Sequence, residues 1–71
     1  MRIPIKINTI EDIKFLYRVA QKENCGMKVC CENTEINADS VLGLSSLMGK
    51  SNLYLLCPDS FEKTCIKAVL R

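Results

Sequence analysis

The chain has 71 residues with 48% apolar content, which predicts one small globular domain with a hydrophobic core. Its formal charge of +2 is too small to indicate nucleic acid binding. Histidine is absent, and this removes the commonest general base, metal ligand and phosphoryl acceptor. No apolar run is long enough for a membrane span and the N-terminus lacks a signal-peptide pattern, so we expect a cytoplasmic protein without a membrane partner.

The cysteines do not indicate a disulfide framework or a metal site. There are five of them, Cys25, Cys30, Cys31, Cys57 and Cys65, and an odd number leaves one without a partner. No two have the spacing of a zinc or thioredoxin motif. Cys30 and Cys31 are adjacent, so in a strand they point to opposite faces and do not make a pair of copper ligands. We therefore expect free, mostly buried thiols, no metal and no cofactor.

The N-terminal part of the chain predicts a strand followed by a helix. Isoleucines at positions 3, 5 and 7 alternate with other residues, which is the period of a half-buried strand. Pro4 indicates that this strand lies at a sheet edge or begins pairing after the proline. Helical spacing then extends from Ile10 to about residue 23, with an apolar face of Ile10, Ile13, Leu16, Tyr17 and Ala20. The sequence Asn24-Cys25-Gly26 is expected to stop this helix.

Two alternative caps and one basic stripe accompany this helix. Either Asn8 with Glu11, or Thr9 with Asp12, has the spacing of a helix cap. On the polar side, Lys14, Arg18 and Lys22 follow one another at one-turn intervals. This stripe is either a solvated helix face or a contact for an acidic partner.

The second half of the chain predicts three more strands and two more helices. A strand over 27–32 turns at Asn33-Thr34 into a short strand that ends at Ile36. A helix over 40–48 follows, and the continuous apolar run Leu53–Cys57 predicts a central strand. Asp59 with Glu62 is expected to cap a closing helix whose inner face consists of Phe61, Cys65, Ala68 and Val69.

This order of elements predicts an α+β fold. Strand, helix, strand, strand, helix, strand and helix (βαββαβα) fit a four-stranded antiparallel sheet with three helices on one face. The strand at 53–57 is expected to lie between the first and second strands. No arrangement of residues predicts catalysis, because no base accompanies a nucleophile and the carboxylates Glu11-Asp12 are explained by a helix start.

The stretch from Ile36 to Gly49 is the most distinctive segment. Ser40 stands where a helix N-cap is expected, a place that also suits a phosphate. Within the helix, Leu44 and Leu47 fall on one side and Val41 and Leu42 largely on the other. A short helix on a sheet buries only one side, so Val41 and Leu42 are candidates for an exposed apolar patch.

The run from Asn37 to Leu47, NADSVLGLSSL, resembles the second-helix signature of the HPr family, the phosphocarriers of the bacterial sugar phosphotransferase system. The resemblance implies one HPr-like domain over 1–71, with an open-faced β-sandwich fold. It also places Thr9 where the family has its phosphoryl-accepting histidine and Glu11 where it has the partner arginine. Because Glu11 would repel a phosphate, the resemblance implies a member without His-dependent phosphoryl transfer.

The same resemblance gives roles to the second helix. Ser40 matches the serine that a dedicated kinase phosphorylates in Gram-positive members, while Val41, Leu42 and Ser45 match the docking patch. Histidine-less relatives use the serine that Ser40 matches to bind a transcription regulator, which implies a regulatory, protein-binding function.

Several functional hypotheses remain open at this point. The first is a non-catalytic binding module that uses the helix at 40–48, with Lys14 and Arg18 as additional contacts. The second is a cysteine-based redox or carrier protein on the same fold. The third is a kinase substrate at Ser40. A homo-oligomer that buries Val41 and Leu42 is a further alternative.

Overall fold

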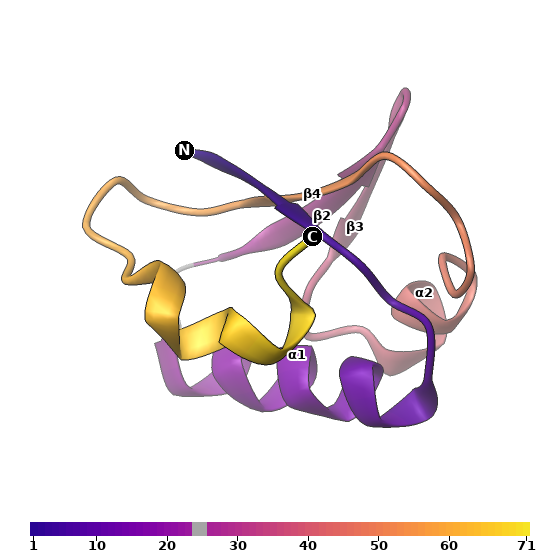
Figure 1. Ribbon diagram of the computed structural model, residues 1–71, viewed down its shortest axis with the longest axis horizontal. Helices are drawn as coiled ribbons and strands as arrows, with labels where there is room; N and C mark the ends of the chain where they lie inside the picture. The colour runs from indigo at the N-terminus through magenta and orange to yellow at the C-terminus, as the bar shows by residue number, and fades with distance from the viewer. Residues whose placement is uncertain (24–25) are drawn as a thin grey trace.

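A computed structural model of the chain describes residues 1–23 and 26–71, which form an α+β fold. The elements are β1 (Arg2–Ile5), α1 (Ile10–Glu23), β2 (Lys28–Cys31), β3 (Thr34–Asn37), α2 (Val41–Ser45), β4 (Leu53–Leu56) and the 3₁₀ helix η1 (Lys63–Val69). The strands form one antiparallel sheet in the order β1-β4-β2-β3 (Figure 1). The predicted central position of β4, between β1 and β2, is confirmed.

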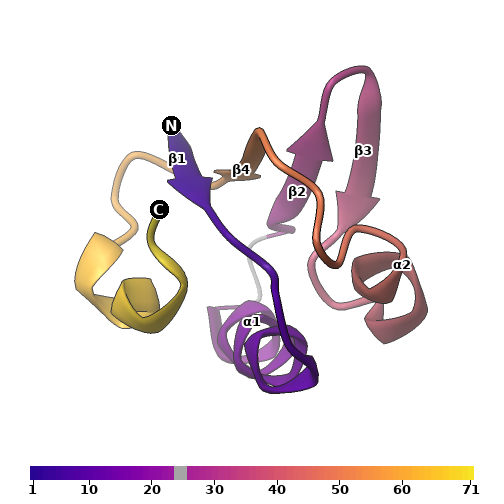
Figure 2. The ribbon, with the colours of Figure 1, turned by 45° about the vertical axis from the view of Figure 1, so that its right-hand side comes forward.

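The hydrophobic core lies between one face of the sheet and the helices. Alternation in the strands places Ile3, Ile5, Leu53 and Leu55 on this inner face, where none is more than 2% exposed. Figure 2 shows α1 below the sheet, with η1 on one side of it and α2 on the other. In the part of the chain that the structure describes, no helix lies against the other face of the sheet, the outer face (Figure 2).

The start of α1 is capped by the second of the two predicted pairs. The Oγ1 of Thr9 accepts a hydrogen bond from the Asp12 amide at 3.3 Å. In return, Oδ2 of Asp12 accepts bonds from the amides of Thr9 (3.2 Å) and Asn8 (2.9 Å). These reciprocal bonds satisfy amides that have no partner inside the helix.

The prediction of a buried apolar face on α1 is confirmed for the middle of the helix and wrong for its first residue. Ile13, Leu16 and Ala20 are buried, but Ile10 is 59% exposed. Ile10 is the first helical residue, one turn before the stretch that packs against the core. The expected helix stop at residues 24–25 lies outside the described residues, and Gly26, which follows, has φ +72°.

The hairpin between β2 and β3 turns one residue earlier than predicted. Cys31 pairs with Thr34, so Glu32 and Asn33 form the loop in place of Asn33-Thr34. Glu32 takes the left-handed conformation, with φ +56°, that a two-residue hairpin loop requires. The sequence lacks the Asn-Gly pair that marks such loops, which is why the pattern placed the turn wrongly.

The closing helix has a different period from the predicted one. η1 consists of two short 3₁₀ segments that join at a kink at Ile66 (φ −121°, ψ 27°), and Ile66 and Val69 both face the core. Cys65 and Ala68, which an α-helical period places inward, are exposed. Phe61, just before η1, is buried as predicted.

The predicted cap of this helix is also wrong. η1 begins after Glu62 without a side-chain hydrogen bond to its amides. The carboxylate of Asp59 lies 3.4 Å from the amino group of Met1 instead. A long-range ion pair has therefore replaced the expected local cap.

In the described parts of the chain, no helix has the length and apolarity that crossing a bilayer requires.

Candidate functional site

A serine cap begins α2 directly after β3. Ser40 has an extended backbone (φ −103°, ψ 102°), and its Oγ accepts a hydrogen bond from the Gly43 amide at 3.1 Å. The predicted N-cap at Ser40 is confirmed. This bond fixes the direction in which the first turn of α2 leaves the sheet.

The helix is shorter than the predicted span of 40–48. α2 ends at Ser45, and the chain continues in tight turns, such as the bond from Leu47 N to Leu44 O at 3.0 Å. The hydroxyls of Ser45 and Ser46 donate to the carbonyls three residues earlier, at 2.8 and 2.6 Å. These side-chain bonds compete with regular helical bonds, which explains the early end of α2.

The inner side of α2 is fixed to the core at several points. Leu44 and Leu47 are 0% and 3% exposed. Gly43 allows close approach to β3, because a Cβ at this position would overlap Cγ2 of Ile36. After α2, the Gly49 amide donates to the Ile7 carbonyl at 2.8 Å, which joins this segment to the connection between β1 and α1. The helix is therefore held in one orientation.

The opposite side of α2 presents apolar side chains to solvent. Leu42 is 86% exposed and Val41 is 47% exposed, as the sequence predicts. Ser45, which is also exposed, lies one turn after Leu42. We call Val41, Leu42 and Ser45 the α2 surface. Its docking role remains a prediction.

Two further apolar side chains are exposed on segments that adjoin α2, and their exposure was not predicted. Met48, which follows α2, is 36% exposed, and Ile10, which begins α1, is 59% exposed. The bond from Gly49 to Ile7 brings their two segments together, and α1 lies alongside α2 in both ribbon views (Figures 1 and 2). The position of Ile10 directly after the Thr9 cap was the sequence signal for its exposure.

Thr9 and Glu11, the degenerate active-site positions of the sequence analysis, both serve the start of α1. The Thr9 hydroxyl is occupied in the cap described above. The Glu11 carboxylate lies 3.9 Å from Nζ of Lys14, and both side chains are largely exposed. Such a pair contributes little to stability, because solvent screens it.

The basic stripe lies on the exposed side of α1. Lys14, Arg18 and Lys22 all have exposed side chains. Among the described residues, no ion pair or hydrogen bond connects Lys14 or Arg18 to α2. The predicted role of Lys14 and Arg18 as additional docking contacts remains a prediction.

The thiols are dispersed through the structure. Cys31 lies in the core with its Sγ 3.8 Å from the Ser51 carbonyl, whereas Cys30 lies on the outer face with its Sγ 3.6 Å from Nη2 of Arg2. The prediction that these neighbours point to opposite faces is confirmed. Cys65 is exposed. Within 1–23 and 26–71, no three His, Cys, Asp or Glu side chains are grouped closely enough to hold a metal ion.

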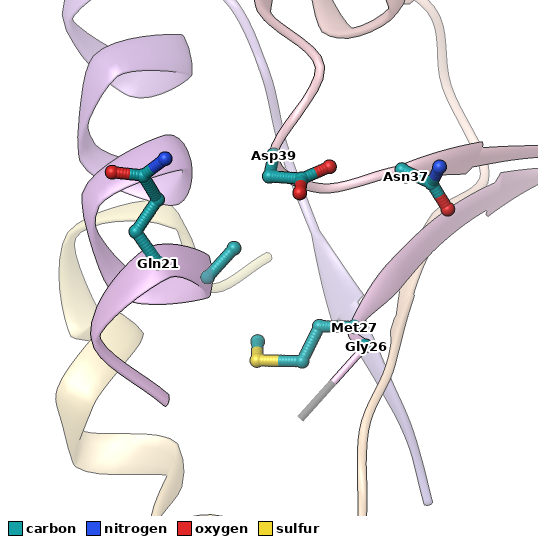
Figure 3. Close-up of a pocket in the computed structure, with 6 residues that line it drawn as sticks. Gln21, Gly26, Met27, Asn37 and Asp39 are labelled. Atoms are coloured by element: carbon teal, nitrogen blue, oxygen red, sulfur yellow. The ribbon is translucent and has the colours of Figure 1, made fainter. Parts of the chain in front are cut away.

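A cavity of about 400 Å³ opens between the end of α1 and strands β2 and β3 (Figure 3). Its lining consists of Ala20, Gln21, Gly26, Met27, Asn37 and Asp39. Figure 3 shows Gln21 on α1, across the opening from Asp39 and Asn37. Two amides and one carboxylate offer hydrogen bonds, but this set does not place a nucleophile beside a base.

Comparisons with known proteins give no relative for this chain. A scan against protein-family models, a search of curated proteins and a search of solved structures each found no match. Its function therefore has to be inferred from its own residues and their arrangement.

Proposed function

We propose that this chain is a non-catalytic protein-binding module that docks a partner protein through the α2 surface. The observation that carries the proposal is the 86% exposure of Leu42, beside Val41 at 47%. The packed core fixes α2 in an orientation that leaves Leu42 exposed to water. Burial of this side chain by a partner lowers the free energy of the complex. Docking sites characteristically combine such exposed apolar side chains with a rigid support.

The proposal includes an HPr-like relationship. It is supported by the NADSVLGLSSL run and by the sheet order β1-β4-β2-β3, with the exposed residues on the element where the family has its docking patch. Thr9 and Glu11 stand at the family's histidine and arginine positions. We therefore propose a regulatory role in the cytoplasm, related to the sugar phosphotransferase system, without His-dependent phosphoryl transfer.

A charged substitution on the α2 surface tests the docking function. Leu42→Asp places a carboxylate at the centre of the surface without touching a core residue. Ala68→Asp is the matched control, because Ala68 is exposed on η1, on the other side of α1 from α2 (Figure 2). We expect wild type and Ala68→Asp to capture the same protein from a lysate of the source cells, and Leu42→Asp to lose it. Equal capture by all three would contradict the proposal.

The second candidate function is that of a kinase substrate at Ser40. The Ser40 hydroxyl lies 3.1 Å from the Gly43 amide, and helix N-terminal amides favour the charge of a phosphoserine. Incubation with an HPr kinase and ATP is expected to label wild type and not Ser40→Ala. Equal labelling of the two proteins, or no labelling of wild type, would exclude this candidate.

A further inference from the structure

The two edges of the sheet differ in what covers them. At the β1 edge, the segment after η1 runs beside the strand, and the Lys6 amide donates to the Val69 carbonyl at 2.9 Å. The Arg71 amide donates to the Pro4 carbonyl of the same edge at 3.2 Å. At the other edge, β3 pairs with β2 only, and in the described parts of the chain no segment runs along its free side (Figure 2). One edge is therefore covered and the other is open.

The hydrogen-bond pattern shows which backbone groups of β3 face the open edge. Successive residues of an edge strand alternate between bonding to the neighbouring strand and pointing away from it. Directly after β3, the Ala38 amide donates to the Met27 carbonyl at 3.0 Å, on the side of β2. Ile36, two residues earlier, therefore also bonds toward β2. Glu35 and Asn37 point their amides and carbonyls to the open edge.

Most of these edge groups have no partner in the chain. The Asn37 carbonyl accepts from the Ser40 amide at 3.1 Å, but within 1–23 and 26–71 nothing beyond β3 bonds to the Glu35 carbonyl or to the amides of Glu35 and Asn37. Such a row of unpaired groups is a template for another strand, and a charged side chain is the usual protection against pairing. Glu35 carries the single charge of β3, and Nζ of Lys28 lies 3.9 Å from its carboxylate. The protective charge is thus partly offset.

We propose that a second copy of this chain binds the open edge, with the two β3 strands antiparallel about a two-fold axis at Ile36. In this register, Glu35 of each copy faces Asn37 of the other, and the two residues exchange backbone hydrogen bonds. The Asn37 carbonyl has two lone pairs, so it accepts from the second copy as well as from Ser40. The two Ile36 side chains then form a non-hydrogen-bonded pair, in which opposite side chains approach most closely.

The side chains of β3 favour this occupant and this register. A two-fold axis at Glu35 would place two carboxylates directly opposite each other, which is destabilising. The axis at Ile36 places isoleucine against isoleucine and carboxylate against amide. Ile36 is only partly buried and lines a hollow of about 560 Å³ together with Thr34 and Leu47, so a second isoleucine adds apolar cover to it. The net charge of +2 is small, so two copies repel each other weakly.

The geometry closes at two copies. Because the β1 edge is covered, each copy offers one open edge, and the pairing occupies both. α2 follows the Asn37 end of β3, so the two-fold axis places the two α2 helices at opposite ends of the paired strands. The pairing uses the backbone of β3, whereas the proposed docking uses side chains of α2. The inference therefore does not rest on the proposed function.

Sedimentation equilibrium over a range of concentrations tests the pairing. We expect wild type to pass from monomer to dimer as the chain concentration rises to about 1 mM. Glu35→Pro removes an amide donor that faces the open edge and leaves the bonds between β2 and β3 intact, so this variant is expected to stay monomeric. Far-UV circular dichroism establishes that each variant is folded.

Two substitutions of Asn37 test the register independently of the proline. Asn37→Lys places a cation opposite Glu35 of the second copy and is expected to tighten dimerisation at least about threefold, whereas Asn37→Glu is expected to weaken it by a similar factor. Within one copy, Asn37 lies opposite Lys28, so the same two changes should lower and raise the Tm of the monomer, respectively. The effects on dimerisation and on stability have opposite signs, so one does not cause the other.

Three results would overturn the proposal. The first is a wild type that stays monomeric up to about 1 mM, whether the edge is idle or receives a strand from another protein. The second is a dimer that survives Glu35→Pro and dissociates in Leu42→Asp, because the copies would then meet through α2. The third is a change of dimerisation in the same direction by Asn37→Lys and Asn37→Glu, because this would exclude the pairing of residue 37 with Glu35.

Discussion

The contact between α2 and β3 makes Gly43 the most informative position in this fold. A Cβ added there would overlap Cγ2 of Ile36 and would lie 3.0 Å from Oγ of Ser40. Gly43→Ala therefore forces α2 away from β3 or displaces the serine that caps it. The substitution tests both the packing of α2 and its N-terminal cap.

The expected magnitude follows from opposing effects. Replacement of a helical glycine by alanine stabilises a helix by up to about 1 kcal/mol. Overpacking costs about 1–3 kcal/mol, and loss of the Ser40 cap adds about 1 kcal/mol. The packing terms dominate, so we expect Gly43→Ala to lower the free energy of unfolding by about 1–3 kcal/mol. For a domain of this size, each kcal/mol corresponds to a decrease in Tm of about 4–8 °C.

Urea denaturation followed by far-UV circular dichroism measures this change, and a second substitution identifies its cause. Ile36→Ala removes the methyl group with which the new Cβ would overlap. In the Ile36→Ala background, Gly43→Ala is expected to be neutral or stabilising, because helix propensity then dominates. If Gly43→Ala is neutral or stabilising in the wild-type background as well, the described packing of α2 on β3 is wrong.

Three other predictions concern the cap of α1, the core and the thiols. Thr9→Ala is expected to lower the free energy of unfolding by about 1 kcal/mol in the same assay, and no change would contradict the cap. Leu44→Ala removes a side chain that is 0% exposed, so a loss of about 2–5 kcal/mol is expected, and a loss below 1 kcal/mol would contradict its burial. In thiol labelling of the native protein, exposed Cys65 is expected to react rapidly. Cys65→Ser should therefore remove one equivalent of thiol from the fast phase of labelling. An unchanged fast phase would contradict this exposure.

The sequence predicted those parts of the fold that depend on strong local periodicity. The isoleucine alternation of β1, the helical spacing of α1 and the continuous apolar run of β4 each have one dominant interpretation. Pro4 correctly indicated an edge strand, because β1 is the outermost strand of the sheet and its other side carries only an isolated bridge between Ile5 and Leu70. The choice between the Asn8 and Thr9 caps was not available from sequence, since both have the required spacing.

The errors came from elements whose signals are weak or not local. Near the C-terminus, the apolar residues fit an α-helical period and a 3₁₀ period almost equally well, and the burial of Ile66 and Val69 decides for the latter. Asp59 has the sequence context of a cap, but it contacts the amino terminus instead. The cation–π contacts of Arg2 and Arg71 with Tyr54 were not predictable from periodicity, because Arg71 comes near this ring only when the segment after η1 pairs with β1.

The exposure of the proposed docking residues could be predicted from the sequence, because a short helix that buries one apolar side leaves its other apolar side chains in solvent. Leu44 and Leu47 are buried, so Leu42 has to point away from the core, and its 86% exposure follows from the helical period. The proposed docking function and the stability of the fold are therefore separable on α2. Leu42→Asp is expected to abolish docking with less than about 0.5 kcal/mol change in stability, as for other exposed positions. A larger loss of stability would mean that Leu42 is already covered in the native protein, as it would be in a homo-oligomer, and sedimentation of wild type against Leu42→Asp would then identify that second copy.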